Sequence, residues 1–255
     1  MHRSASRLTR ILACAAVPVM LVVAGCSSDS GSKKESDGSS SSAPGAKKSV
    51  AAVEQAKFAE LPDPCKAIST KTITALVPKA KNKAGTPATS SDTAARAGCS
   101  WNGLDDNGVK GSQYRWLDVG FTRFDSDQAL GSGAKRAEDD LTKQLAKTRT
   151  AEGAKKLVEA PVSGIGEQAT KVTYDLTKTG EDFKYATIVA RTGNVVVTLT
   201  YNGAGYAGAK TPSGADILKD AEKAAKEAVA AVTDANEKQS SPSASPSKSA
   251  KSSSN

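Results

Sequence analysis

The segment 183–201, FKYATIVARTGNVVVTLTY, constrains the fold of this chain most strongly. Two runs rich in Val, Ile and Thr lie on either side of Arg191-Thr192-Gly193-Asn194, a pattern typical of a β-hairpin. Strands joined by so tight a turn must be antiparallel, because parallel neighbours need a crossover of a dozen or more residues. The sequence therefore predicts a sheet that is mainly antiparallel.

Other segments add strands and helices to this sheet. Alternating apolar residues predict a second hairpin over 96–124, turning at Asp106-Asn107-Gly108, and a further strand over 171–177. Helical periodicity predicts helices over 133–149 and 213–232. A loop is expected at 203–208, whose G-x-G-x-x-G spacing lacks the strand that would complete a dinucleotide site.

The start of the folded region predicts a first helix with two possible N-caps. Asp63 followed by Pro64 is one, and Ser69 or Thr70 is the other, with Pro78 ending the helix. The resulting order is helix, hairpin, helix, several strands and helix. It predicts an α+β fold, a mainly antiparallel sheet with about three helices packed on one side, in one domain.

The N-terminus has the pattern of an export signal. Arg3, Arg7 and Arg10 precede the 15-residue apolar run 11–25. As a helix this run rises roughly 22 Å, less than the ~30 Å hydrocarbon core of a bilayer. A basic start, a short apolar run and small final residues predict a cleaved signal peptide over residues 1–25.

The residues around Cys26 give the signal a more specific interpretation. Val23-Ala24-Gly25-Cys26 is similar to the lipobox of bacterial lipoproteins, in which the Cys thiol receives a diacylglyceryl group and becomes the new N-terminus. We therefore expect a covalent lipid anchor on Cys26 and an exported protein on the outer face of the cell membrane, with no other cofactor. The alternative is an ordinary secretory signal that contains a Cys.

The remaining cysteines form a pair. With Cys14 removed and Cys26 acylated, Cys65 and Cys99 remain, and in an exported chain the default is one disulfide. Two free thiols are the alternative. Composition then divides the mature chain into a flexible Ser/Gly/Lys tether (26–49), a globular domain (50–236) and a disordered Ser/Pro-rich tail (237–255).

Charge and residue types exclude several functions. The formal charge is +8, but segment 50–236 holds 25 basic and 23 acidic residues, a net +2, so no nucleic-acid partner is expected. His2, the single histidine, leaves with the signal, which excludes histidine-based catalysis and metal sites. Paired acids at Asp105-Asp106, Asp139-Asp140 and Glu181-Asp182 fit solvated turns or a helix surface, and no metal site is expected.

Three aromatic residues of the first hairpin form a candidate binding surface: Trp101, Tyr114 and Trp116. By alternation Tyr114 and Trp116 share the face opposite Leu117 and Phe121. If the latter pair faces the core, Tyr114 and Trp116 are partly exposed and available to a ligand. The alternative is that a helix or loop covers them.

In combination, these features resemble the actinobacterial lipoproteins that contain the domain of unknown function 3558 (DUF3558). The matching features are the lipobox, Asp63-Pro64-Cys65, the CSW segment 99–101, the GIGEQA segment 164–169 and ARTGNVVVTLTY at 190–201. The resemblance implies a lipid-anchored envelope protein, a Cys65–Cys99 bridge and an α+β fold, in a family with no assigned activity. There is also a resemblance to the extracellular sensor domains of actinobacterial membrane kinases.

The sequence thus predicts a lipid-anchored cell-envelope protein with a non-enzymatic, sensor-like domain. Its partners would be the membrane, through the anchor, and an envelope ligand or protein. The alternatives are an envelope hydrolase that uses carboxylates, which requires converging acids with perturbed pKa values, and an accessory subunit of a membrane complex, which requires a large exposed apolar patch.

Overall fold

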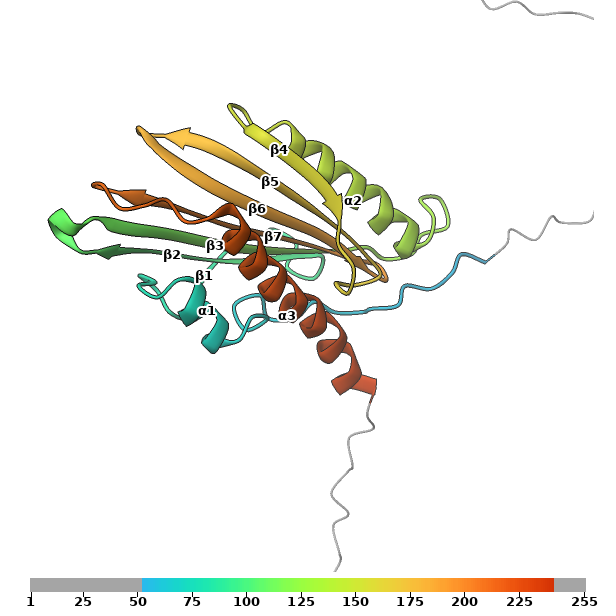
Figure 1. Cartoon of the computed structure of the whole chain (residues 1–255). Coiled ribbons are helices and arrows are strands. Elements are labelled where there is room, and N and C mark those ends of the chain that lie inside the picture. Colours follow the sequence, from blue (N-terminus) through green and yellow to red (C-terminus); the bar gives the residue numbers. More distant parts are fainter. Residues whose placement is uncertain (1–51, 241–255) are drawn as a thin grey trace, which may run out of the picture. The chain divides into compact units, whose positions relative to one another are not determined.

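The structure, a computed structural model, describes residues 52–240. These residues form a single antiparallel sheet with helices packed on it. The seven strands follow the order β1-β2-β3-β7-β6-β5-β4 (Figure 1). Their bounds are β1 (Thr86–Pro87), β2 (Arg96–Asp106), β3 (Ser112–Arg123), β4 (Lys155–Pro161), β5 (Gln168–Lys178), β6 (Glu181–Thr192) and β7 (Val195–Tyr206). The predicted antiparallel α+β fold in one domain is confirmed.

Within residues 52–240, three α-helices accompany the sheet: α1 (Thr70–Leu76), α2 (Gly133–Arg149) and α3 (Gly214–Ser240). A 3-10 turn over Gly108–Lys110 joins β2 to β3, so the predicted hairpin forms there. The second predicted hairpin is β6–β7. No helix within residues 52–240 is long and apolar enough to cross a membrane.

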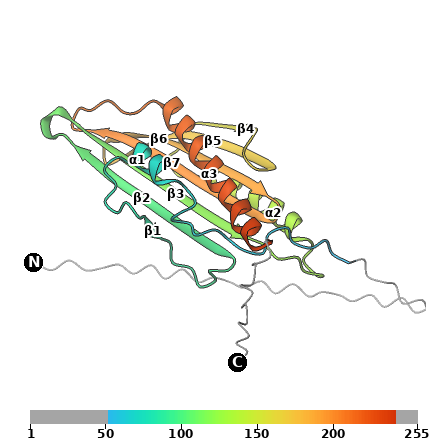
Figure 2. The ribbon, with the colours of Figure 1, turned by 90° about the horizontal axis from the view of Figure 1, so that it is seen from below.

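The prediction that the helices pack on one side of the sheet is wrong. α1 and α3 lie on one face and α2 lies on the other (Figures 1 and 2). The reason is that β6 and β7 are apolar on both faces, as the consecutive buried residues Val195, Val196 and Val197 show. A strand buried on both faces reads as a continuous apolar run and needs cover on each side.

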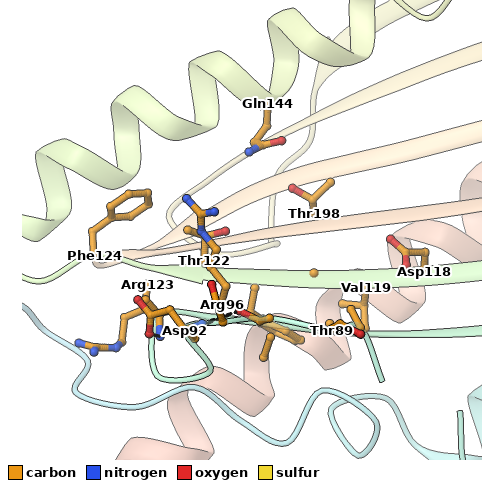
Figure 3. A pocket seen from close by; sticks show the side chains of 18 of the residues that line it. Thr89, Asp92, Arg96, Asp118, Val119, Thr122, Arg123, Phe124, Gln144 and Thr198 are labelled. Atoms are coloured by element: carbon orange, nitrogen blue, oxygen red, sulfur yellow. Dashed lines mark hydrogen bonds between the residues drawn. The ribbon is translucent and has the colours of Figure 1, made fainter. Parts of the chain in front are cut away.

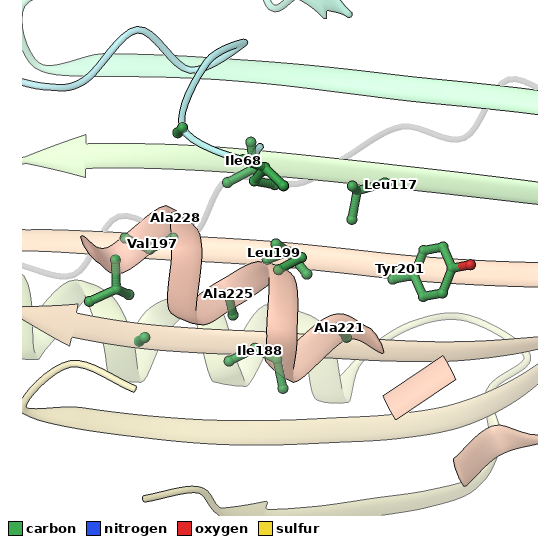
Figure 4. Packing of buried hydrophobic residues seen from close by; sticks show 14 of the residues in the cluster. Ile68, Leu117, Ile188, Val197, Leu199, Tyr201, Ala221, Ala225 and Ala228 are labelled. Atoms are coloured by element: carbon green, nitrogen blue, oxygen red, sulfur yellow. The ribbon is translucent and has the colours of Figure 1, made fainter. Parts of the chain in front are cut away.

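The larger core lies between the sheet and α3. Ala221, Ala225 and Ala228 face the sheet, and their small side chains let the helix lie close to Val197 and Leu199 (Figure 4). The second core lies under α2, whose Ala137, Leu141 and Leu145 pack on apolar residues of β5, β6 and β7. Both cores depend on β7, which contributes side chains to each.

Of the two predicted N-caps for the first helix, Ser69 is the one used. Its Oγ accepts the Thr72 N–H at 3.2 Å, and α1 begins at Thr70. Asp63 instead closes a turn: its Oδ1 accepts the Cys65 N–H at 3.0 Å, and its carbonyl accepts the Lys66 N–H. The predicted disulfide joins this turn to β2, with Cys65 and Cys99 bonded and their Cα atoms 5.2 Å apart.

Three other parts of the domain differ from the prediction. The segment 203–208 is not a loop, because β7 continues to Tyr206. Gly205 is required there, since a Cβ would lie 2.2 Å from the Ala209 carbonyl oxygen. β4 was not predicted, because its residues are mostly exposed and do not alternate. α3 runs to Ser240, past the boundary set at residue 236.

Asn194, in the β6–β7 turn, connects three distant segments. Its side chain is fully buried. Oδ1 accepts the Phe58 N–H at 2.7 Å, and Nδ2 donates to the carbonyls of Phe58, at 2.9 Å, and Phe124, at 2.8 Å. The turn that the sequence predicts thus also anchors the segment before α1 and the end of β3.

We predict that Asn194→Ala lowers the free energy of unfolding by about 2–4 kcal/mol, because buried backbone groups of Phe58 and Phe124 lose their partners. Urea unfolding followed by Trp fluorescence measures the change. Asn236→Ala is the matched control: Asn236 binds the same segment at Ala59 and Glu60, but in exposed surroundings where water can replace it. Equal losses in the two variants would contradict this role.

Candidate binding site

The site begins with the partial cover of the sheet by α2. This helix packs mainly on β6 and β7, so the same face of β2 and β3 has less cover. A groove of about 700 Å³ lies there, between α2 and the segment 88–92 (Figure 3). We call it the sheet groove and define it by Thr89, Asp92, Arg96, Gly98, Asp118, Gly120, Thr122, Arg123, Phe124, Arg136, Gln144 and Thr198.

Its floor consists of two glycines on adjacent strands. Gly98 of β2 and Gly120 of β3 are register partners, and Gly120 also pairs with Thr198 of β7. A Cβ on Gly120 would meet nothing nearer than the Thr198 carbonyl oxygen at 3.9 Å, and its φ lies outside the left-handed region. The backbone therefore does not require glycine at 120.

Gly120 thus differs from the other strand glycines. At Gly103 a Cβ would lie 2.2 Å from the Lys79 carbonyl oxygen, and at Gly98 it would lie 3.1 Å from the Val119 carbonyl oxygen. Glycine within a strand weakens it, because it restricts the chain less and packs no side chain. The structural consequence of glycine at 120 is open space above the sheet.

Asp118 stands beside this floor. It alternates with the core residues Leu117 and Val119, so it points to the α2 face with Gly120. Burial raises the pKa of the Asp118 carboxyl above its ordinary value of 3.8. No hydrogen bond or ion pair joins its side chain to any residue in 52–240. This carboxyl has lost water without gaining a protein partner.

Arg96 is a positively charged residue of the groove that, like Asp118, has no partner within residues 52–240. The other charged residues of the groove have partners: Arg123 pairs with Asp125, Arg136 donates to the Asp125 carbonyl at 2.7 Å, and Asp92 Oδ1 accepts the Ala95 N–H at 3.1 Å. The Arg96 guanidinium has none among the described residues. Thr122, Thr198 and Gln144 add hydroxyl and amide groups from three different elements (Figure 3).

The structure separates the three aromatic residues that the sequence grouped. Trp101 is 2% exposed in the α3-side core, because its register partner is Leu117. It cannot contribute to a surface with the other two. Tyr114 and Trp116 are half-buried and share the α2 face with Asp118. Tyr114 belongs to an aromatic cluster with Phe183 and Tyr206, at centroid distances of 5.9 and 6.4 Å.

Trp116 lies next to a further polar group without a partner in the described part of the chain, besides Asp118 and Arg96. It is in register with Asn202 of β7, whose side chain is completely buried. Neither the amide nitrogen nor the oxygen of Asn202 has a hydrogen bond. Buried polar groups normally have a hydrogen-bond partner. This part of the α2 face therefore also carries a polar side chain that makes no hydrogen bond within the fold.

Two acids also line a smaller cleft of about 270 Å³. Asp105 and Asp220 both line it, with Arg115 and Tyr201. Burial and, secondarily, Asp216 raise the pKa of Asp220. Burial also raises the pKa of Tyr201 to about 12, and its hydroxyl donates to the Leu76 carbonyl at 2.7 Å. The phenol is therefore protonated and engaged.

The acid pairs noted in the sequence otherwise have structural roles. Asp106 Oδ1 accepts the Gly108 N–H at 2.9 Å and the Ser112 hydroxyl at 2.9 Å, which closes the β2–β3 turn. Asp139 pairs with Lys135 on the surface of α2, at 2.7 Å. Within residues 52–240, no group of three or more His, Cys, Asp or Glu side chains could hold a metal ion. Cys26 lies outside the described residues.

The fold and the groove define a disulfide-bonded α+β domain with a polar site on the α2 face. Residues 21–178 match the family described as "Protein of unknown function (DUF3558)". The chain therefore belongs to this family, which confirms the resemblance. The match ends before β6, so ARTGNVVVTLTY lies outside it.

Comparisons with solved structures and with curated proteins identify no further relationship. The crystal structure of LpqN, described as involved in cell envelope biogenesis of Mycobacterium tuberculosis, is 13% identical with a TM-score of 0.31. The alignment covers 56% of this chain and 82% of that chain. A TM-score this low does not establish a shared fold. A search of curated proteins finds no match.

We predict that Asp118→Asn stabilises the domain at pH 7. Because folding raises the pKa of this carboxyl, ionising it costs more in the folded than in the unfolded state. The cost is present at neutral pH, falls as the pH drops through the raised pKa, and disappears below 3.8, where both states are protonated. The variant should therefore have a higher free energy of unfolding at pH 7 and no advantage near pH 3.

Urea unfolding of both proteins at pH 7, 5 and 3 measures this difference. Asp139→Asn is the control, since Asp139 is exposed and paired with Lys135, and it should be neutral or slightly destabilising at pH 7. A loss of stability in Asp118→Asn at pH 7 would mean that the carboxylate has a stabilising partner.

Proposed function

We propose that this protein is an exported, lipid-anchored protein of the cell envelope whose domain binds a small polar ligand in the sheet groove without chemically changing it. The N-terminal signal pattern and the lipobox at Cys26 support export and anchoring. The disulfide supports an oxidising compartment outside the cytoplasm. Membership of the DUF3558 family is consistent with both.

Gly120 is the observation that carries the binding function. A strand glycine that the backbone does not need, with open space above it, weakens the fold and leaves room for a ligand. It lies between Asp118 and Thr122, which present a carboxyl and a hydroxyl to that space. A concave site with a few convergent polar groups is the usual form of a small-molecule site.

The residues of the groove are suited to holding a ligand rather than to activating one. They supply carboxyl, hydroxyl, amide and guanidinium groups, and the two domain cysteines are bonded to each other. A hydrolase would need a positioned acid and base. The cleft lined by Asp105 and Asp220 is the observation that favours the hydrolase alternative, because two acids line it and the pKa of Asp220 is raised.

The accessory-subunit alternative has less support. The exposed large apolar residues of the described part are scattered over β2, the turn that follows it, the loop before α2 and the edge strand β4, and only two are adjacent. They are Leu104, Val109, Leu130, Leu157 and Val158. Single exposed apolar residues are normal on a soluble domain and define no docking surface.

We predict that Gly120→Val abolishes ligand binding in the groove while leaving the domain folded. Valine has higher β-propensity than glycine, so the free energy of unfolding should stay constant or rise by up to about 1 kcal/mol. Ligand-observed NMR with a library of polar fragments measures binding. Gly214→Ala, at the start of α3 where a Cβ meets nothing within 4 Å, is the control outside the groove and should bind like the wild type.

Fragments that bind Gly120→Val as well as the wild type would contradict the groove as the site. A large loss of stability in Gly120→Val would instead mean that glycine is needed there for folding.

We further predict that Cys26→Ser abolishes lipid attachment. Serine has no thiol to accept the diacylglyceryl group, so metabolic labelling with palmitate should fall to background and the protein should leave the membrane fraction. Cys14→Ser, which lies inside the expected signal, is the control and should label normally. Undiminished labelling of Cys26→Ser would refute the anchor.

A further inference from the structure

We infer that the ligand of the sheet groove carries both a cationic and an anionic group, with the cation held by Asp118 and the anion by Arg96. This inference rests on the proposed function, because it names the class of ligand for the same site. Three features of the groove support it, and none depends on the anchor: two charged side chains without partners, the spacing between them and the groups that lie between them.

The first feature is the selective lack of partners. Five charged side chains line the groove, and three of them already have partners. Among the described residues, the remaining two, Arg96 and Asp118, have neither an ion pair nor a side-chain hydrogen bond. They carry opposite charges. A ligand that bound only one of them would leave the other unmatched, and for the partly buried Asp118 that state is costly.

The second feature is the distance between them. Arg96 is in register with Thr122, and Asp118 lies four residues before Thr122 on β3. At about 3.3 Å per residue the two rows are roughly 13 Å apart along the strands. No ion pair within 4.0 Å joins the Arg96 and Asp118 side chains, which lie apart in the groove (Figure 3). A ligand several ångströms long would contact both charges.

The third feature is what lies between the charges. Gly98 and Gly120 occupy the intervening row and project no side chain, so the sheet surface is open there. Thr122, Thr198 and Gln144 surround this space with hydroxyl and amide groups. A short ligand backbone would lie over the glycines with its charged ends at Asp118 and Arg96. Its polar centre would meet the hydroxyls and the amide.

The test is a titration of the isotopically labelled protein with four probes, followed by NMR at the Gly98 and Gly120 amides. Glycylglycine and O-phosphoethanolamine each carry an ammonium group and an anion, and ethylamine and propionate carry one charge each. A ligand needs both opposite charges to bind well. We therefore expect at least one of the two probes that carry both an ammonium group and an anion (the doubly charged probes) to bind at least tenfold more tightly than ethylamine or propionate. If the protein binds glycylglycine more tightly, the anion of the ligand is a carboxylate; if it binds O-phosphoethanolamine more tightly, the anion is a phosphate.

Two substitutions assign the ends of the ligand. Asp118→Asn and Arg96→Gln should each weaken the doubly charged probe at least tenfold, and Asp118→Asn should leave the affinity for propionate unchanged. Asp139→Asn and Arg149→Gln remove an acid and an arginine of α2 that do not line the groove, and both should bind like the wild type.

Other outcomes overturn the inference in distinguishable ways. If singly charged or neutral fragments bind the groove as tightly as the doubly charged probes, the ligand class is wrong but the groove remains a binding site. If the two groove substitutions change nothing, the assignment of Asp118 and Arg96 is wrong. If no probe or polar fragment shifts the Gly98 and Gly120 amides, both the inference and the proposed function fail.

Discussion

The double pairing of β7 is the constraint on which the rest of this structure depends. β7 is the middle strand of seven, with β3 on one side and β6 on the other, and it pairs with β3 along its whole length. It thus joins the hairpin that precedes α2 to the strands that follow α2. Since β7 and β6 are apolar on both faces, each face of the sheet must be covered, by α3 on one side and by α2 on the other.

The groove follows from how that cover is distributed. α2 is placed over the apolar side chains of β5, β6 and β7, and the part of β2 and β3 that lines the groove on this face carries Gly, Asp, Thr and Arg instead. A glycine inside a strand and a desolvated carboxyl without a partner both lower stability. Neighbouring residues that each lower the stability of the fold are expected at functional sites. Asp118 and Gly120 are two residues apart on the same strand face.

The sequence predicted those features that depend on local patterns. Both hairpins, the Ser69 cap and the disulfide follow from turn residues, capping residues and an even cysteine count. The two-sided helix packing was missed, although the run Val195-Val196-Val197 contained a signal for it. The burial of Trp101 could have been found from the hairpin register, which places it opposite Leu117.

The groove itself could not be predicted from local patterns. Arg96, Asp118 and Thr198 come from three strands, and only the register brings them to one face. A lone Asp in an alternating strand predicts nothing more than a polar face. The significance of Gly120 depends on the space above it, which is set by where α2 lies. Asn194 was recognised as a turn residue, whereas its three hydrogen bonds to segments 70 and 136 residues away required the structure.

Chemical-shift mapping of the labelled protein with polar fragments tests the central claim most directly, because it reports where on the domain a ligand binds. We expect the largest amide shifts to fall on Gly98, Asp118, Gly120 and Thr122, which line the sheet groove. Shifts concentrated instead on Asp105, Arg115 and Asp220 would place the site in the smaller cleft and would contradict it.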